Sequence, residues 1–387
     1  MKIQTNTICI NPEHPVRAAG YAQQVEPVSE IRDNLYARTL VIEQQGTRYV
    51  HIALDSLQAP KELMHSLKQQ LQKAWGMPVC LVISGTHTHF APDMRDSQYR
   101  QQVLRQLSEA LSDLEMEEAE LTCSFVREPF GKIGASRISH WTTDQIFAQT
   151  LCIYNHGRRV ATLLIHNCHP TVLSGDTPFF TCEYPGLAVR HLQQRYPDEF
   201  FSYLQGACGD VSTRFIRRAQ TVEQMEEFGQ IMADEFDSLL QRQPEPFPCR
   251  MGYQDHWLDL QHELKNPDSL IIPEYYSKRE RETLVYGIEA SRKNLANPEH
   301  LASQTMFSVL DFGGVRLIFS EFELFSEYNK ATDPQHSALI CYSQGYSHYV
   351  AGPSFDGMTY ETLQDTLAPK TREAILALIR RYSAVAE

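Results

Sequence analysis

Two histidines, His87 and His89, stand one residue apart, directly after an apolar run at residues 79–84. In an extended segment, side chains two residues apart point to the same side, so both imidazoles would face one centre. Imidazole is a preferred zinc ligand, and ligand sites collect at the carboxyl ends of strands in α/β sheets. The pair therefore indicates a metal site, although paired histidines also occur on ordinary surfaces.

A second apolar run, residues 159–166, leads into His166, Cys168 and His169. His169 lies further past the predicted strand, next to Pro170, and is the better ligand candidate, whereas His166 fits a core position. Cys168 is a possible ligand or nucleophile. Because no neighbouring residue indicates a lowered thiol pKa, we interpret it as a small buried residue.

The segment 205–212 contains two glycines and ends at Ser212. Glycines let a backbone approach a ligand closely, and the amides of such a segment can bind an anion or an oxyanion. Ser212 is a possible nucleophile, but the segment is not the G-x-S-x-G turn of serine hydrolases. A tight turn capped by Asp210 explains the spacing equally well.

Two glutamates late in the chain, Glu321 and Glu323, would face the same way in an extended segment. If a helix began there, they would instead be acids at its N-terminus, an alternative of equal weight. The tyrosines that follow, in residues 346–349, fit half-buried packing positions.

Hydrophobic periodicity predicts the elements that position these side chains. Three hairpins are expected, at residues 35–44 with 47–55, 146–154 with 159–166, and 306–311 with 315–320. Helices are expected at residues 60–75, 96–114, 184–195, 221–241, 280–297 and 363–382. We therefore expect an α/β fold with mixed β-sheets and hairpins flanked by helices, in a single catalytic domain. The sequence shows no repeat and no convincing linker.

The chain of 387 residues is acidic, with 48 Asp and Glu, 35 Lys and Arg and a formal net charge of −13. It has no long basic run, which excludes a nucleic-acid partner and electrostatic docking on anionic membranes. No apolar run approaches the ~20 residues that span a bilayer, so we expect no stable membrane insertion.

Nine cysteines are scattered along the chain without a C-x-x-C pair. An odd, scattered set favours free thiols in a reducing compartment. The first residues contain no apolar segment of a secretory signal. We therefore expect a cytoplasmic protein.

Taken in order, the motifs resemble the catalytic domain of the neutral/alkaline, non-lysosomal ceramidase family. The family pattern contains an Ala-Gly-Tyr segment, Tyr-Ala-Arg, T-H-T-H, a histidine after a strand, G-D-x-S, Glu-Phe and a pair of tyrosines. This chain matches it at residues 19–21, 36–38, 86–89, 169, 209–212, 321–322, 349 and 360. The resemblance implies one zinc hydrolase domain over residues 1–387, without the C-terminal β-domain that secreted ceramidases carry.

Carried over by position, the resemblance implies four zinc ligands: His87, His169, Glu321 and Tyr349. A phenolate is an unusual ligand, and only the resemblance points to it.

Four further residues take roles from the same resemblance. His89 would lie beside the metal as a proton donor or oxyanion partner. Tyr360, with Arg137, would hold the substrate carbonyl or headgroup. Ser212 matches a serine once regarded in the family as a nucleophile.

The resemblance thus implies a zinc-dependent amidohydrolase that cleaves an N-acyl bond of a small-molecule substrate by metal-activated water. Two alternatives stay open: a hydrolase that uses Ser212 as a covalent nucleophile, and a non-catalytic binding module that kept the fold. Departures from the family pattern at Phe90 and at residues 213–214, with the expected lack of a further domain and leader, favour a small amide over ceramide.

Overall fold

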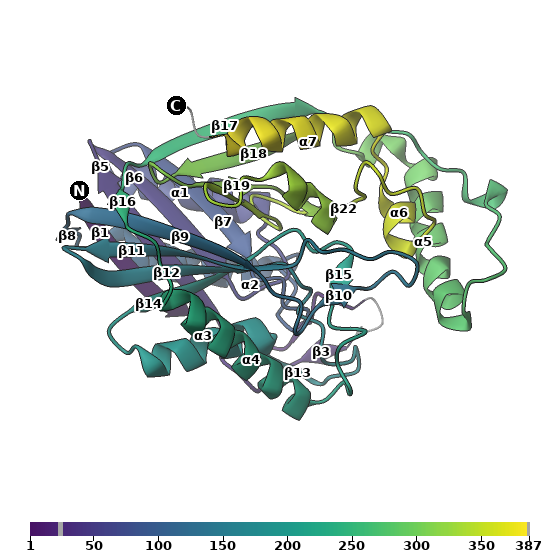
Figure 1. The fold of residues 1–387 in the computed structure, drawn as a ribbon, viewed down its shortest axis with the longest axis horizontal. Helices are drawn as coiled ribbons and strands as arrows, with labels where there is room; N and C mark the ends of the chain where they lie inside the picture. Colours follow the sequence, from purple (N-terminus) through teal and green to yellow (C-terminus); the bar gives the residue numbers. More distant parts are fainter. Residues whose placement is uncertain (22–25, 385–387) are drawn as a thin grey trace.

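The computed structural model describes residues 1–21 and 26–384, and its architecture is shown in Figure 1. The first sheet has the order β7-β6-β5-β1-β8 and the second the order β14-β12-β11-β9-β16. The first comprises β1 Lys2–Cys9, β5 Tyr36–Gln44, β6 Thr47–Leu54, β7 Val79–Gly85 and β8 Glu117–Glu118. The second comprises β9 Leu121–Pro129, β11 Phe147–Asn155, β12 Arg158–His166, β14 Phe200–Gln205 and β16 Phe247–Pro248.

A third sheet has the order β17-β18-β19-β21 and comprises β17 Gly252–Asp259, β18 Gln304–Asp311, β19 Arg316–Phe319 and β21 Ser337–Ile340. Short two-stranded ladders complete the described strands. They are β2 Val16–Arg17 with β3 Pro27–Val28, β4 Glu30–Ile31 with β13 Phe179–Phe180, β10 Ala135–Ser136 with β15 Val211–Ser212, and β20 Phe322–Leu324 with β22 Ser347–Val350.

The three large sheets repeat one topology. Each contains two antiparallel steps followed by a parallel one: β1-β5-β6-β7, β9-β11-β12-β14 and β17-β18-β19-β21. In each unit the last two strands are parallel, so their carboxyl ends meet at the same edge, where α/β sheets place their sites. The sequence showed no repeat, because the repetition lies in strand pairing and not in residue identity.

Helices cover the sheets and close one end of the molecule. In Figure 1, α3 and α4 lie below the second sheet, α7 lies over the third, and α5 with α6 form the end furthest from the N-terminus. The described helices are α1 Lys61–Trp75, α2 Ser97–Ser112, α3 Glu183–Arg195, α4 Val222–Leu240, α5 Lys278–Ala296, α6 Tyr360–Gln364 and α7 Pro369–Ser383, with 3₁₀ turns at Pro267–Ser269, Pro298–His300 and Ser326–Ala331.

The expected mixed α/β class is confirmed, and so are all three hairpins to within two residues. The predicted helix at residues 363–382 is wrong in one respect, because it is two helices. Leu367 forms a β-bridge with His262, and Pro369 opens α7. Proline cannot sit inside a helix without losing a hydrogen bond, but it is well suited to the first turn.

All nine cysteines are free, as their scattered spacing predicted. Among the described residues, no helix is both long enough and apolar enough to cross a membrane. Apolar side chains between the sheets and under the helices form the core, which leaves the strand ends to carry polar groups.

Candidate metal centre

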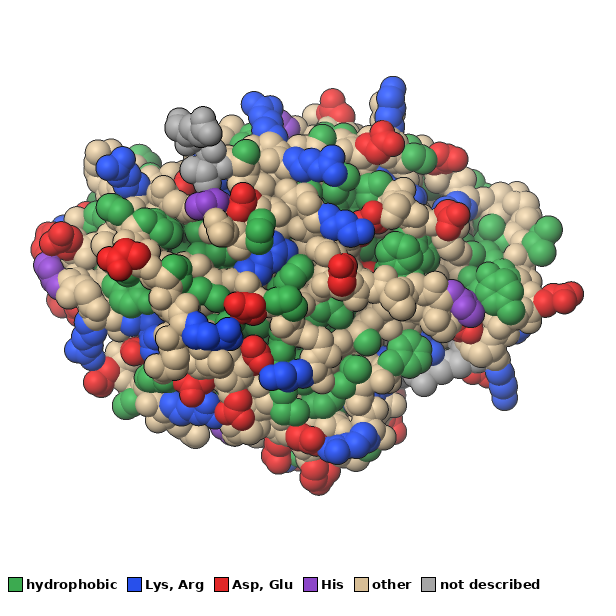
Figure 2. Space-filling model, viewed as in Figure 1, with side chains coloured by type: hydrophobic (Ala, Val, Ile, Leu, Met, Phe, Trp, Pro, Cys, Tyr) green, Lys and Arg blue, Asp and Glu red, His purple; other side chains and the backbone are tan. Residues whose placement is uncertain are grey.

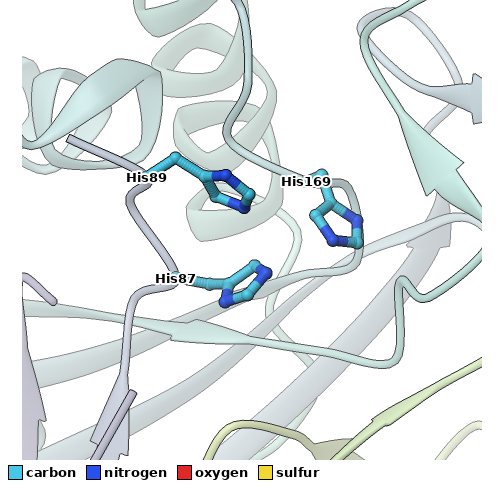
Figure 3. Close-up of side chains that lie close together, drawn as sticks. All are labelled: His87, His89 and His169. Atoms are coloured by element: carbon cyan, nitrogen blue, oxygen red, sulfur yellow. The ribbon is translucent and has the colours of Figure 1, made fainter. Parts of the chain in front are cut away.

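Three imidazoles, those of His87, His89 and His169, converge at the carboxyl ends of the first two sheets (Figure 3). One nitrogen from each lies within 4.8 Å of the others. His87 and His89 follow β7, and His169 follows β12. The structure therefore brings together the two histidine segments that the sequence singled out.

His87 is held from two sides. Its Nδ1 lies 2.9 Å from the carbonyl oxygen of Leu57, and the ring of Tyr342 stacks on it at 3.6 Å between centroids. Its backbone is left-handed, with φ of 64°, so the segment is not the extended strand that we expected. The imidazoles of His87 and His89 still face one centre, because this turn orients them.

His169 is fixed by the segment 205–212. Its Nδ1 lies 2.8 Å from the carbonyl oxygen of Cys208 and 2.9 Å from that of Val211, and its amide also donates to Val211. We expected that segment either to offer amides to an anion or to form a tight turn capped by Asp210. It offers carbonyls, which orient the imidazole so that Nε2 faces the cluster.

Glu323 supplies a carboxylate to the same centre. Its Oε2 lies 3.1 Å from Nε2 of His169 and 3.7 Å from Nε2 of His87, and it is buried. Hydroxyls of Tyr342 and Tyr346 also donate to this carboxylate. With His87 and His169 it forms a set of two nitrogens and one oxygen.

Glu321, which the family pattern suggested, does not join the histidines. Its Oε2 lies 2.7 Å from Nζ of Lys61, and its Oε1 accepts a hydrogen bond from Thr305. The two carboxylates therefore have different partners and do not face one centre. The acidic residue at the cluster is the second of the pair, not the first.

Tyr349 and Tyr360 line the cavity of about 410 Å³ that contains His87 and His89. Their rings meet edge to face, with centroids 5.8 Å apart. Tyr349 pairs with Glu323 in the β20–β22 ladder, which places it beside the cluster. Both expected tyrosines are therefore in the cavity.

Arg137 follows β10 and lines the same cavity. Its guanidinium lies over the ring of Tyr349, and its Nε lies 2.9 Å from Oε1 of Glu361. Burial opposes its charge, but the neighbouring Tyr349, Glu361 and Glu323 outweigh burial and raise the pKa of Arg137. It stays a cation in the cavity.

Ser212 is buried at the cavity wall, and its Oγ accepts a hydrogen bond from the amide of Arg214. Among the described residues, no imidazole nitrogen hydrogen-bonds to this hydroxyl. A serine nucleophile needs such a base.

His166 and Cys168 occupy core positions. Nδ1 of His166 lies 2.7 Å from the carbonyl oxygen of Phe147, and burial lowers its pKa to about 4. Burial raises the pKa of Cys168 to about 12, so the thiol is protonated at neutral pH.

His89 packs against the Ala-Gly-Tyr segment. A Cβ on Gly20 would lie 2.2 Å from that of His89, and Tyr21 meets the imidazole edge to face at 5.1 Å. Only glycine fits there. The close approach explains why a glycine stands at position 20, against His89.

The donor set fits a metal ion. Nε2 of His87 and both ring nitrogens of His89 are buried and make no hydrogen bond of normal geometry with the described residues. Burial lowers the pKa of His89 to about 3 and those of His87 and His169 well below the usual value, so the imidazoles are neutral. Neutral imidazoles whose Nδ1 is bound to a backbone carbonyl are characteristic zinc ligands.

Two solved structures share this architecture: a ceramidase complexed with C2, and neutral ceramidase from Pseudomonas aeruginosa. Each has a TM-score of 0.77 and 12% sequence identity, over 99% of this chain and 74% of the other. The chain has the neutral ceramidase fold. No protein-family sequence model matches it, and no curated protein sequence does.

Within this ceramidase fold, sequence reasoning missed two residues at the cluster, Tyr342 and Tyr346, and did not choose Glu323 as the ligand. For Glu323 the signal was present, since its spacing from Glu321 had placed it among the candidates. Tyr342 and Tyr346 reach the centre from the segment between β21 and β22, and the sequence carries no local signal for that contact.

Proposed function

We propose that the protein is a zinc-dependent amidohydrolase that cleaves an N-acyl bond with metal-activated water. The observation that carries the proposal is the unpartnered Nε2 of buried His87 beside His169 and the carboxylate of Glu323. Buried polar atoms without partners are rare and call for a ligand. A zinc ion is the ligand that this donor set prefers.

The proposed ligands are Nε2 of His87, Nε2 of His169, a carboxylate oxygen of Glu323 and the phenolic oxygen of Tyr349. Glu323 replaces Glu321 because only its carboxylate lies within hydrogen-bond distance of a histidine of the cluster. Tyr349 stays the fourth candidate because it pairs with Glu323 across the ladder and lines the cavity.

Bound zinc polarises a carbonyl and lowers the pKa of a coordinated water to ~7. Side chains of the protein would carry out proton transfer, oxyanion stabilisation and substrate orientation. His89, a neutral imidazole beside the cluster, takes a proton from the attacking water and passes it to the leaving amine. Tyr360 donates a hydrogen bond to the developing oxyanion, and Arg137 orients the substrate.

The geometry of the site also bears on two alternative functions. Covalent catalysis by Ser212 is disfavoured, because its Oγ is bonded to the Arg214 amide and not to an imidazole. A non-catalytic binding module would hold the same metal, and the hydrolysis assay described below separates it from an enzyme.

A cytoplasmic location is part of the proposal, since nine free thiols suit a reducing compartment. For the substrate we propose a small N-acyl amide in preference to ceramide. The departures from the family pattern at Phe90 and at residues 213–214 support this choice.

The test is hydrolysis of short N-acyl amines by zinc-loaded protein, compared with detergent-dispersed ceramide. Activity should vanish with a chelator and return with zinc. His87→Ala and His169→Ala should lose both metal and activity, and His65→Ala, at an exposed position on α1, should lose neither. Full activity in the chelated protein would refute the proposal, as would chelator-resistant labelling of Ser212 by a serine-directed probe.

A further inference from the structure

The turn that carries His87 rests on one backbone segment, which closes β6 and leads towards α1. The amide of His87 donates to the carbonyl oxygen of Ser56 at 2.9 Å, and its Nδ1 lies 2.9 Å from the carbonyl oxygen of Leu57. The amide of Thr86, the preceding residue, donates to the carbonyl oxygen of Leu54 at 2.8 Å. The position of the imidazole therefore depends on where this segment holds its carbonyls.

Asp55 stands in the middle of that segment and ties it to β5. Its Oδ2 accepts hydrogen bonds from the amide of Tyr36 at 2.9 Å and from Nη1 of Arg38 at 3.1 Å. Its own amide donates to the carbonyl oxygen of Tyr36 at 2.9 Å. The ladder of β5 and β6 ends at the pair of Ala37 and Leu54, so the Asp55 carboxylate carries the connection one step further.

The ion pair of Arg38 and Asp55 is buried, unlike the charges at the surface. Figure 2 shows Lys, Arg, Asp and Glu side chains spread over the face that it draws, where water and salt screen their interactions. Asp55, in contrast, is 1% exposed and Arg38 8%. Burial raises the pKa of Asp55, and Arg38 is the strongest influence that opposes this rise.

Overall stability alone does not account for such a pair. Replacing a buried ion pair with apolar residues is often neutral or stabilising, because taking two charges out of water costs free energy. Neither Arg38 nor Asp55 lines the cavity that contains His87, so the pair acts on the site only through the backbone. The nearest part of the site that this backbone reaches is Nδ1 of His87.

We propose that Arg38 and Asp55 are a positioning pair, which holds Nδ1 of His87 on the carbonyl oxygen of Leu57 and thereby aims Nε2 at the metal. This inference rests on the proposed function, in which His87 is a zinc ligand. A metal-binding imidazole needs its second nitrogen fixed, because that contact sets the tautomer and the direction of the ring. Here the fixing atom is a backbone carbonyl, and the ion pair fixes the backbone.

The first measurement is zinc affinity, from titration of each apoprotein against a competing chelator. Asp55→Ala removes both hydrogen bonds to Oδ2 and should weaken zinc binding ~10–100-fold, the usual effect of losing a group that orients a ligand. Asp55→Asn keeps an oxygen for the Tyr36 amide and for Arg38, so it should restore most of the affinity.

Glu199→Ala is the matched control. Glu199 forms a partly buried, two-point ion pair with Arg159, at the end of β12 far from His169. Its loss should lower the melting temperature, as Asp55→Ala does, and leave zinc affinity unchanged. A pair that only stabilises the fold would behave like Arg159 and Glu199.

The second measurement needs no metal. In apoprotein with isotope-labelled histidine, NMR detects the Nδ1 proton of His87, which is identified by its absence in His87→Ala. This proton should be protected from exchange with water in the wild type and in Glu199→Ala, and it should exchange rapidly in Asp55→Ala. If the wild type binds no zinc, the proposed function fails, and this proton still decides the inference.

A protected Nδ1 proton in Asp55→Ala would overturn the inference, and so would wild-type zinc affinity in that variant. If Asp55→Ala does not fold, Arg38→Met takes its place, because it removes the ion pair and keeps the acceptor for the Tyr36 amide. The same two results, weaker zinc binding and faster exchange of the His87 proton, are then expected, and their absence refutes the positioning role.

Discussion

Oε2 of Glu323 lies 3.1 Å from Nε2 of His169, although 154 residues separate them in the chain. The contact joins the third sheet unit to the second, and the 3.7 Å approach of Glu323 to His87 joins it to the first. Three copies of one strand topology thus each contribute a side chain to one centre.

The two glutamates flanking Phe322 give a matched pair of variants. Glu323→Gln should lower zinc affinity by at least ~10-fold, because it removes a charged oxygen beside two imidazoles. Glu321→Gln alters the ion pair with Lys61 and should leave zinc affinity unchanged. Titration of each purified apoprotein with zinc against a competing chelator measures both. If only Glu321→Gln lowers zinc affinity, Glu321 is the ligand, as the family pattern implies.

His89 is expected to act on protons and not to hold the metal. His89→Ala should keep stoichiometric zinc and lose ~10²–10⁴-fold in kcat, the range for a general acid. The measurements are metal content and steady-state kinetics on one preparation. If zinc is lost with the side chain, His89 belongs among the ligands; if kcat is unchanged, it has no part in the proton transfer.

Tyr349 and Tyr360 should give opposite phenotypes when each is changed to Phe. Tyr349→Phe removes a proposed ligand atom and should weaken zinc binding. Tyr360→Phe should leave zinc affinity alone and lower kcat/KM by ~10²–10³-fold, as when one oxyanion donor is lost. Reversed phenotypes would exchange the two assignments.

Gly20 positions His89 through packing. Gly20→Ala places a Cβ 2.2 Å from that of His89 and must displace the imidazole, so kcat should fall by at least ~10-fold. Gly131→Ala is the control, because its Cβ would find only the carbonyl oxygen of Gly134, at an ordinary 3.7 Å. Normal activity in the Gly20 variant would show that the position of His89 is not critical.

His51 should make the folded protein sensitive to acid. Burial lowers its pKa to about 3, whereas in the unfolded chain it is near ~6.5. Between these values the unfolded state binds a proton that the folded state does not, so stability falls as pH falls below about 6.5.

From pH 7.5 to pH 5.5 this group should account for about 1 kcal/mol of lost stability. Urea unfolding at both pH values should therefore show a smaller loss for His51→Gln than for wild type. His65→Gln, at an exposed site, should follow the wild type. An identical loss of stability in all three proteins would show that His51 does not contribute to the acid sensitivity.

The sequence predicted what local patterns determine. The hairpin of β5 and β6 turns at Gln45 and Gly46, both with positive φ, and the turn residues carry that information. The two histidine segments follow apolar strands, which is also a local pattern. The break between α6 and α7 was missed although Pro369 marks it locally, and the bridge from Leu367 to His262 fixes the segment between the two helices.

The choice between Glu321 and Glu323 could not be made from the sequence alone. Residue type and spacing allow either, and only the contacts of the folded chain, Lys61 at Glu321 and His169 at Glu323, distinguish them. The tyrosine at position 342 has no local signal, since its stacking on His87 arises where the third sheet unit meets the first.

The most direct test of the account is zinc content and amide hydrolysis measured together in wild type, Glu323→Gln and Glu321→Gln. The account predicts about one zinc per chain and chelator-sensitive hydrolysis in wild type and in Glu321→Gln, with both lost in Glu323→Gln at limiting zinc. A wild-type protein that holds no stoichiometric metal after zinc loading, or that hydrolyses amides equally well without it, would contradict the central claim.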